Sequence, residues 1–167
     1  MKNRIFAFIK SIYSYVIIVI VVLLIKYFIV TPIKVNGNSM NDTLYNNDIM
    51  ILDKISYRFN DIKRFDIVVI KREKDYLIKR IIGLPGDKIE YKNNQLYVNN
   101  QFIEENFLHK YTNDYEEDVI PENYYFVLGD NRINSSDSRY IGLINRKDIL
   151  GKTSLTIFPF NRFGTKK

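Results

Sequence analysis

The first strong pattern in the sequence is a nearly continuous apolar run from Ser11 to Val30, interrupted by one charge at Lys26. A helix needs roughly 20 apolar residues to cross the hydrocarbon core of a bilayer, so this run predicts one transmembrane helix. Lys26 lies near the far end of the run, where its aliphatic stem can follow apolar surface while the ammonium reaches the headgroups. Tyr13, Tyr15 and Tyr27 would lie toward the two interfaces, where aromatic side chains gather.

A cleavable signal peptide is the other interpretation of this run. The run is too long for that, and no small-x-small cleavage pattern follows it before Pro32, so we expect a retained anchor. Lys2, Arg4 and Lys10 precede the run, and basic residues in a short tail tend to keep the N-terminus cytoplasmic. The chain after Val30 should therefore lie outside the cell membrane, because a long folded domain is translocated largely regardless of its charge.

After Pro32 the pattern changes to short apolar runs that are rich in β-branched residues and bounded by polar turns. Three such runs cover residues 48–53, 65–70 and 76–82, and each predicts a β-strand. The third is closed by the sequence Gly-Leu-Pro-Gly-Asp at residues 83–87, which is a strong turn signal.

The rest of the chain continues the β pattern. Apolar residues alternate through residues 88–103, where two Asn-Asn pairs are typical of hairpin turns. Residues 104–122 are acidic and irregular and predict a loop or short excursion, whereas residues 124–128 and 155–160 predict two further strands. No helical period is sustained outside the apolar run and no internal repeat is visible. We therefore expect a mostly β fold, with an N-terminal tail and anchor over residues 1–30 and one domain over residues 31–167.

Composition narrows the possible chemistry. The 167 residues include no cysteine, which excludes disulfides and thiolate metal sites, and a single histidine, His109, which argues against a two-histidine metal site. A serine–histidine–aspartate triad could be built only around His109. The net charge of +6 suits either a nucleic-acid partner or an anionic lipid surface, and does not choose between them.

Two residues are candidates for nucleophilic catalysis. Ser39 follows the apolar run in a loop that has Gly37 two residues earlier, and Lys79 lies within an apolar strand-like run. A serine hydroxyl needs a neighbouring base, and lysine can be that base if its ammonium is desolvated enough to lose its charge. A turn serine is more often a local hydrogen-bond former, and a strand lysine can simply be an outward-pointing edge charge.

A third motif covers residues 129–142, a glycine-bounded loop that contains several hydroxyls and charges of both signs. It could be a solvated turn or a calcium site. A hand-type calcium loop needs a terminal glutamate, and this loop has none and carries Arg132 and Arg139. Calcium is therefore not expected.

Four stretches, in this order and after an N-terminal anchor, resemble the sequence boxes of the type I signal peptidases, in their short Gram-positive-like form. Residues 39–44 resemble the nucleophile box, residues 65–69 the second strand box, residues 79–87 the lysine box and residues 129–142 the final box. The resemblance spans essentially the whole chain. It implies a β domain of antiparallel sheets, with serine endopeptidase activity.

The resemblance also implies roles for individual residues. Ser39 would attack the scissile carbonyl, with its backbone amide in the oxyanion hole, and Lys79 would act as general base. Ser135 aligns with the serine that orients the lysine. The residues that align with two structural ion pairs near the site are Asp137 with Arg139 and Asp130 with Arg80. These pairs are expected to hold the loop and not to touch substrate.

Two positions depart from the family pattern. Some members carry a second oxyanion donor, a side-chain hydroxyl, at the position of Gly37, and glycine cannot supply it. Asp42 replaces the usual proline of the nucleophile box, which removes the φ restraint of proline and adds a charge near Ser39. A carboxylate close to Lys79 would favour the charged lysine and oppose its action as a base.

Substrate is expected to bind as an extended strand between residues 32–39 and 76–79, through main-chain hydrogen bonds. The residues that resemble those lining two shallow apolar pockets are Ile33, Val35, Met40 and Ile78. Small pockets reject large side chains, which implies small residues of the Ala-x-Ala type before the cut. The same four residues could instead be plain core.

The resulting prediction is a single-pass cell-membrane enzyme that removes signal peptides from secretory preproteins. Its expected partners are those preproteins and membrane lipid, with no cofactor, metal or nucleic acid, and His109 is expected to be a surface loop residue. A serine–lysine autocleaving repressor would be cytoplasmic and carry a DNA-binding region, and no helix-turn-helix pattern is visible. A non-enzymatic, basic, membrane-tethered binding module would show salt-sensitive binding and no peptidase activity.

Overall fold

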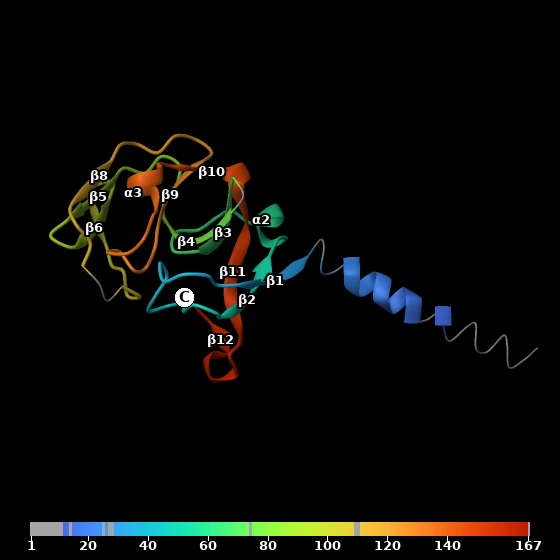
Figure 1. Ribbon diagram of the computed structural model, residues 1–167. Coiled ribbons are helices and arrows are strands. Elements are labelled where there is room, and N and C mark those ends of the chain that lie inside the picture. The colour runs from blue at the N-terminus through green and yellow to red at the C-terminus, as the bar shows by residue number, and fades with distance from the viewer. Residues whose placement is uncertain are drawn as a thin grey trace, which may run out of the picture.

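The computed structural model describes residues 12–13, 15–24, 26, 29–73, 75–108 and 111–166 (Figure 1). The described residues between 12 and 26 are helical, and the large apolar side chains among residues 12–24 are exposed. No helix within the described residues is both long and apolar enough to cross a membrane. The anchor therefore stays a prediction. Residues named in the sequence analysis that lie outside the described ones are Lys2, Arg4, Lys10, Ser11, Tyr27 and His109.

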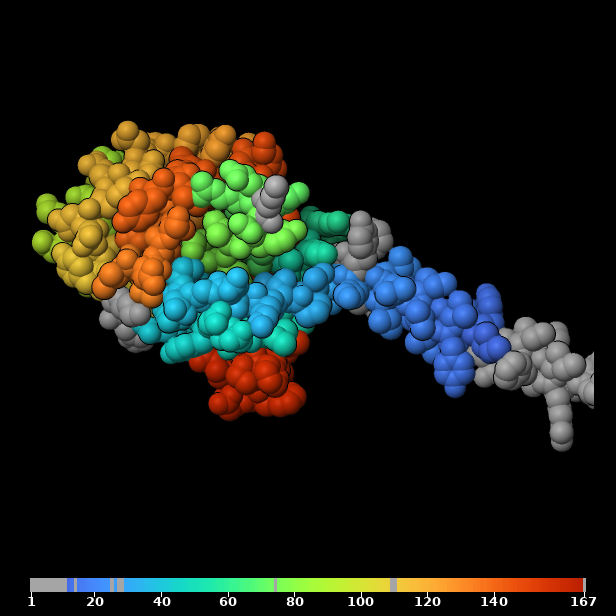
Figure 2. Space-filling view, in the orientation of Figure 1, coloured from blue at the N-terminus to red at the C-terminus, as the bar shows by residue number. Residues whose placement is uncertain are grey.

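A large antiparallel sheet forms the body of the protein. Its strands are β1 (Val30–Lys34), β2 (Ile49–Asp53), β3 (Ile67–Arg72), β4 (Asp75–Gly83), β9 (Tyr124–Leu128), β10 (Ile144–Asn145), β11 (Ile149–Phe158) and β12 (Gly164–Thr165). The strand order is β1-β2-β11-β3-β4-β9-β10, and β12 pairs with β11. Figure 2 shows the N-terminal segment, in blue to cyan, as a band between the green strands and the red C-terminal lobe.

A second, smaller antiparallel sheet lies beyond β9 (Figure 1). Its strands are β5 (Ile89–Lys92), β6 (Gln95–Val98), β7 (Gln101–Ile103) and β8 (Tyr115–Glu117), in the order β7-β6-β5-β8. Four short helical turns complete the fold: α2 (Ser56–Phe59), α3 (Ser138–Ile141), η1 (Arg146–Asp148) and η2 (Phe160–Arg162). The prediction of a mostly β domain of antiparallel sheets is confirmed.

The local patterns predicted most strands. Both Asn-Asn pairs lie between consecutive strands with positive φ at every asparagine, between 51° and 65°, as primed hairpin turns require. Two predictions were wrong in extent. The last long strand begins at Ile149 and not at residue 155. Its first half was missed because polar Lys152 interrupts the apolar pattern, although alternate residues of that half are buried. The expected loop at 104–122 contains β8, which pairs with β5 and has no apolar period of its own.

Strand β1 was not predicted, and it begins at the residue where the predicted anchor ends. It pairs only with β2 among the described strands, so it forms an edge of the large sheet. Pro32 is tolerated there because an edge strand has one side without ladder hydrogen bonds. The five strands β1, β2, β11, β3 and β4 are joined by four antiparallel pairings, so β1 and β4 run parallel to each other.

Gly151 allows β11 to pass close to β2. A Cβ added there would fall inside contact distance of the Asp53 carbonyl oxygen, which is backbone and cannot rotate away. We expect Gly151→Ala to lower the free energy of unfolding by about 2 kcal/mol or more, because the two strands must separate. Urea unfolding of the detergent-solubilised chain measures this loss. Gly86→Ala, where the added Cβ meets nothing within 4 Å but φ is +85°, should lose only about 1 kcal/mol, and equal losses would contradict the steric explanation.

Candidate active site

The loop of residues 35–48, which joins β1 to β2, carries Ser39 and is fixed at both ends. The amide of Val35 donates to the Asp48 carbonyl at 2.8 Å, and the amide of Asn47 donates to the Val35 carbonyl at 2.9 Å. Inside the loop the side chains of Met40 and Leu44 are buried in one core cluster with β2 and β3. Ser39 precedes Met40, so burial of that methionine fixes the position of the serine backbone.

Asn131 holds the same loop from the opposite side. Its backbone amide donates to the Ser39 carbonyl at 2.9 Å, and its side-chain amide donates to the Asn38 carbonyl at 3.0 Å. Sequence reasoning did not single out Asn131, because it lies in a polar loop far from Ser39 along the chain. The only indication in the sequence was that Asn131 lies within the glycine-bounded motif of residues 129–142.

Lys79 lies on β4 opposite Val68 of β3 and is only 2% exposed. Its Nζ donates to Ser39 Oγ at 2.7 Å, which brings together the two residues that were candidates for nucleophile and base. Burial lowers the pKa of Lys79 from 10.5 to about 8, since it disfavours the charged form. The negative charges of Asp137 and Asp130 act in the opposite direction, and the positive charge of Arg139 lowers the pKa further.

Each of these two carboxylates is paired with an arginine. Asp130 accepts two bonds from the buried Arg80, at 2.9 and 2.6 Å, and Asp137 accepts two from Arg139, at 2.8 and 2.9 Å. Asp137 also accepts from the amide of Gly129 at 3.1 Å. The pairings are those implied by the family resemblance. Because each carboxylate is partly neutralised, its field at Lys79 is weakened and the amine keeps a low pKa.

Ser135 lies beside Gly129. A Cβ added at Gly129 would collide with Ser135 Oγ and with the carbonyl oxygen of Ser39, which shows how closely these three residues approach. Within the part of the chain that the structure describes, Ser135 Oγ is buried and has no hydrogen-bond partner. The bond to the lysine that the resemblance implies is not formed here, and the orienting role of Ser135 stays a prediction.

Asp42 is exposed and has φ = +76°. It lies in a turn in which the amides of Thr43 and Leu44 donate to the Met40 carbonyl at 3.1 and 2.8 Å. Proline, with φ fixed near −65°, cannot adopt this backbone, whereas aspartate tolerates it. The turn is therefore built differently from one that carries proline.

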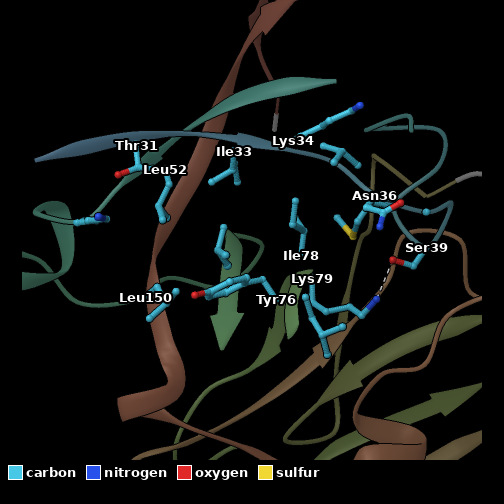
Figure 3. A pocket seen from close by; sticks show the side chains of 16 residues that line it. Thr31, Ile33, Lys34, Asn36, Ser39, Leu52, Tyr76, Ile78, Lys79 and Leu150 are labelled. Atoms are coloured by element: carbon cyan, nitrogen blue, oxygen red, sulfur yellow. Dashed lines mark hydrogen bonds between the residues drawn. The ribbon is translucent and has the colours of Figure 1, made fainter. Parts of the chain in front are cut away.

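A cavity of about 410 Å³ opens beside Ser39 and Lys79 (Figure 3). Residues of both β1 and β4 line it, although β2, β11 and β3 lie between those strands in the sheet, so the large sheet curls around the cavity. The four predicted pocket residues all line the cavity, namely Ile33, Val35, Met40 and Ile78. Val35 and Met40 are also buried members of the core cluster, so lining and core are not exclusive roles for them.

Two braces were not predicted from the sequence. Buried Arg132 donates to the Gly129 carbonyl at 3.1 Å, to Tyr91 Oη at 2.9 Å and to Thr112 Oγ1 at 2.8 Å, and it pairs with Glu105. These bonds attach the motif at 129–142 to the smaller sheet. No local sequence signal distinguishes this arginine from a surface one.

The second brace fixes the nucleophile loop from the C-terminal side. Arg162 of η2 donates to Asp48 Oδ2 at 3.0 Å, and its guanidinium carbon lies 3.8 Å from the centre of the Tyr45 ring. Asp48 Oδ2 also accepts from the amide of Tyr45 at 2.9 Å.

Among the described residues, no group of three or more histidine, cysteine, aspartate or glutamate side chains could hold a metal ion.

The close approach at Gly129 gives a test of the site geometry. We expect Gly129→Ala to displace Ser39 and Ser135, because the added Cβ would overlap the Ser39 carbonyl oxygen, which is backbone held by the Asn131 amide, and the buried Ser135 hydroxyl. The peptidase activity that the sequence resemblance implies should fall by about 100-fold in the variant, since a 1 Å shift near the reacting atoms can have that effect. Steady-state kinetics with the Gly86→Ala variant as control measures it. Wild-type activity in Gly129→Ala would contradict the close approach.

The chain is similar to known proteins over most of its length. The family model described as "Signal peptidase, peptidase S26" matches residues 8–158. Signal peptidase I P of Bacillus subtilis subsp. natto is 41% identical, over 96% of this chain and 93% of the relative. Signal peptidase IB of Staphylococcus aureus strain Mu50 is 37% identical, over 86% of each chain.

A solved structure is also similar. The crystal structure of a signal peptidase I from Enterococcus faecalis V583 is 34% identical and superposes with a TM-score of 0.52, covering 56% of this chain and 97% of that one.

Proposed function

The chain belongs to the type I signal peptidases of family S26, which are serine endopeptidases that remove signal peptides, and we propose that it works through Ser39 as nucleophile and Lys79 as general base. The observation that supports this pair is the 2.7 Å separation of Lys79 Nζ and Ser39 Oγ, within the range for proton transfer. The non-enzymatic binding module considered from the sequence is not retained, because the family is a peptidase family.

In the proposed reaction the neutral Lys79 amine takes the proton of the Ser39 hydroxyl while Oγ attacks the carbonyl carbon of the scissile bond. The resulting ammonium then protonates the leaving amine as the tetrahedral intermediate collapses to an acyl-enzyme. Lys79, neutral again, removes a proton from a water that attacks the ester carbonyl. The released acid is the signal peptide, and Ser39 regains its proton from Lys79.

The oxyanion of the tetrahedral intermediate is proposed to accept a hydrogen bond from the backbone amide of Ser39. Gly37 supplies no hydroxyl, but its φ of +91° suits glycine and lets the loop turn into Ser39. Ser135 is proposed to orient Lys79, and its buried hydroxyl without a partner among the described residues is consistent with a bond formed during the reaction.

The neighbouring ion pairs are proposed to position the dyad without touching substrate. Arg80 with Asp130 and Arg139 with Asp137 are all buried or nearly so, and each pair is bidentate. Loss of one member would leave an unpaired charge beside Lys79 and would change both the loop and the lysine pKa.

Substrate is proposed to enter the cavity as an extended strand between β1 and β4. Strand β9 pairs with β4 only from Arg80 onward, so residues 76–79 pair with β3 on one side and line the cavity on the other, where none of the described strands pairs with them. Since β1 and β4 are parallel, one peptide can run parallel to both. Its side chains at −1 and −3 would meet the pocket residues Val35 with Met40 and Ile33 with Ile78, which favours the Ala-x-Ala pattern.

The proposed location is the cell membrane, with residues 1–30 as a cytoplasmic tail and anchor and residues 31–167 as the extracytoplasmic catalytic domain. The apolar run from Ser11 to Val30 and the exposed apolar side chains of its described part support this placement. Secretory preproteins and membrane lipid are the proposed partners.

Removing either member of the dyad tests the mechanism. Ser39→Ala removes the nucleophile, and Lys79→Met removes the base while keeping a buried chain of similar length. Each should lower kcat for a preprotein with an Ala-x-Ala site by more than about 1,000-fold, because members of a catalytic unit fail together. The measurement uses the detergent-solubilised chain. Lys88→Met, a change at a lysine whose side chain is 43% exposed, is the control and should keep full activity. Substantial cleavage by Ser39→Ala would refute the serine mechanism.

The dependence of rate on pH tests the protonation state. The pKa of Lys79 is about 8 and the neutral amine is the active form, so activity is lost as pH falls below 8. We expect kcat/KM to rise about tenfold per pH unit below that value and to level off above it, whereas a lysine of ordinary pKa would still be gaining activity near pH 10. A profile that is flat from pH 6 to pH 9 would exclude Lys79 as the base.

A further inference from the structure

The cavity is longer than the two proposed pockets require. In Figure 3 Ser39 and Lys79 lie at one end, Ile33 and Ile78 lie in the middle, and a further set of side chains lies at the other end. We call that end the distal compartment. The side chains labelled there are Thr31, Leu52, Tyr76 and Leu150, from four different strands, and Lys54, two residues after Leu52, also lines the cavity.

The distal compartment is in register with the proposed substrate. Side chains on one face of a strand recur every two residues, at a spacing of roughly 6.6–6.8 Å. On β1 the residue two before Ile33 is Thr31, and on β4 the residue two before Ile78 is Tyr76. On both strands, therefore, the distal compartment lies two residues before the pocket proposed for the −3 side chain.

The floor of the distal compartment follows the same register. Thr31 is paired directly with Leu52 of β2, and Leu150 enters from β11, which pairs with β2 on its other side. The Thr31 hydroxyl donates to the Lys26 carbonyl at 3.0 Å, so it is already bonded and does not need a polar group from a ligand. The other lining side chains, Leu52, Tyr76 and Leu150, are aliphatic or aromatic, and Lys54 is the charged residue at this end of the cavity.

These side chains also differ from ordinary core. Tyr76 is 65% exposed, and Thr31 and Leu150 are only partly buried, although all line a concave surface. A side chain placed between them would remove apolar surface from water on both sides, which is a favourable change. Leu52, in contrast, is buried and closes the floor.

We propose that the distal compartment is a third subsite, which binds a branched aliphatic or aromatic side chain at position −5 of the signal peptide. The inference rests on the proposed function, because it needs the peptide to lie extended with −1 at Ser39. Side chains alternate along an extended peptide, so those at −4 and −6 point to the opposite face and only the one at −5 can reach this subsite.

The test uses one preprotein with alanine at −1 and −3 and with glycine or leucine at −5, cleaved by the detergent-solubilised full chain. Leucine at −5 should raise kcat/KM by about 10-fold over glycine, which is the range for an aliphatic group in an apolar site. A second pair of substrates, with glycine or leucine at −4, should show no such gain. Equal rates for the two −5 substrates, with both cleaved efficiently, would overturn the subsite and leave the proposed function intact. Failure to cleave any of them would overturn the proposed function.

Variants of the compartment test whether it causes the preference for leucine over glycine at −5. Leu150→Trp fills the compartment, so the leucine-to-glycine ratio should fall to about 1 or below. If that variant does not fold, as judged by its thermal unfolding, Tyr76→Ala removes one wall at an exposed position and should also lower the ratio. Tyr111→Ala, at a tyrosine that is 56% exposed and does not line the cavity, should keep the wild-type ratio. An unchanged ratio in Leu150→Trp or Tyr76→Ala that is folded would overturn the assignment.

Discussion

The structure depends on one unfavourable burial, that of the Lys79 amine against Ser39. Taking an amine out of water disfavours its charged form, and here burial lowers the lysine pKa from 10.5 to about 8, so that the neutral amine predominates above that pH. Two carboxylates lie close enough to oppose that effect. Each is already held in a bidentate bond to an arginine, Asp130 to Arg80 and Asp137 to Arg139, so the site keeps its acidic residues without recharging the lysine.

The loop at residues 129–142 is where these constraints meet. Asn131 fixes the backbone of Ser39, the two aspartates hold their arginines, and Arg132 ties the loop to the smaller sheet. Gly129 lies so close to Ser39 and Ser135 that only a residue without a side chain fits there. The smaller sheet, which contributes nothing to the cavity lining, thus supports the site through Arg132 and its buried partners.

The cavity follows from the way in which the large sheet curls. A sheet face that carries apolar side chains must be covered, and the nucleophile loop covers part of this face by packing Met40 and Leu44 against β2 and β3. Where the loop ends, β1 and β4 face each other without pairing, and their apolar side chains line an open cavity instead of a closed core. Burial of apolar side chains stabilises the domain, and the apolar side chains that line the cavity can be buried by an extended peptide.

The sequence by itself determined the features that depend on neighbouring residues. Strand periods, the Asn-Asn turns and the ordered boxes around Ser39 and Lys79 are all written in short stretches, and they predicted the antiparallel β fold and the family. Only the tertiary structure decided that Asn131 holds Ser39, that Arg132 reaches the smaller sheet and that β1 faces β4. These contacts join segments far apart in the chain, and they depend on which strands pair and how strongly the sheet curls. Residue type and local spacing carry no information on that geometry, because the energy that selects it comes from burying whole faces at once.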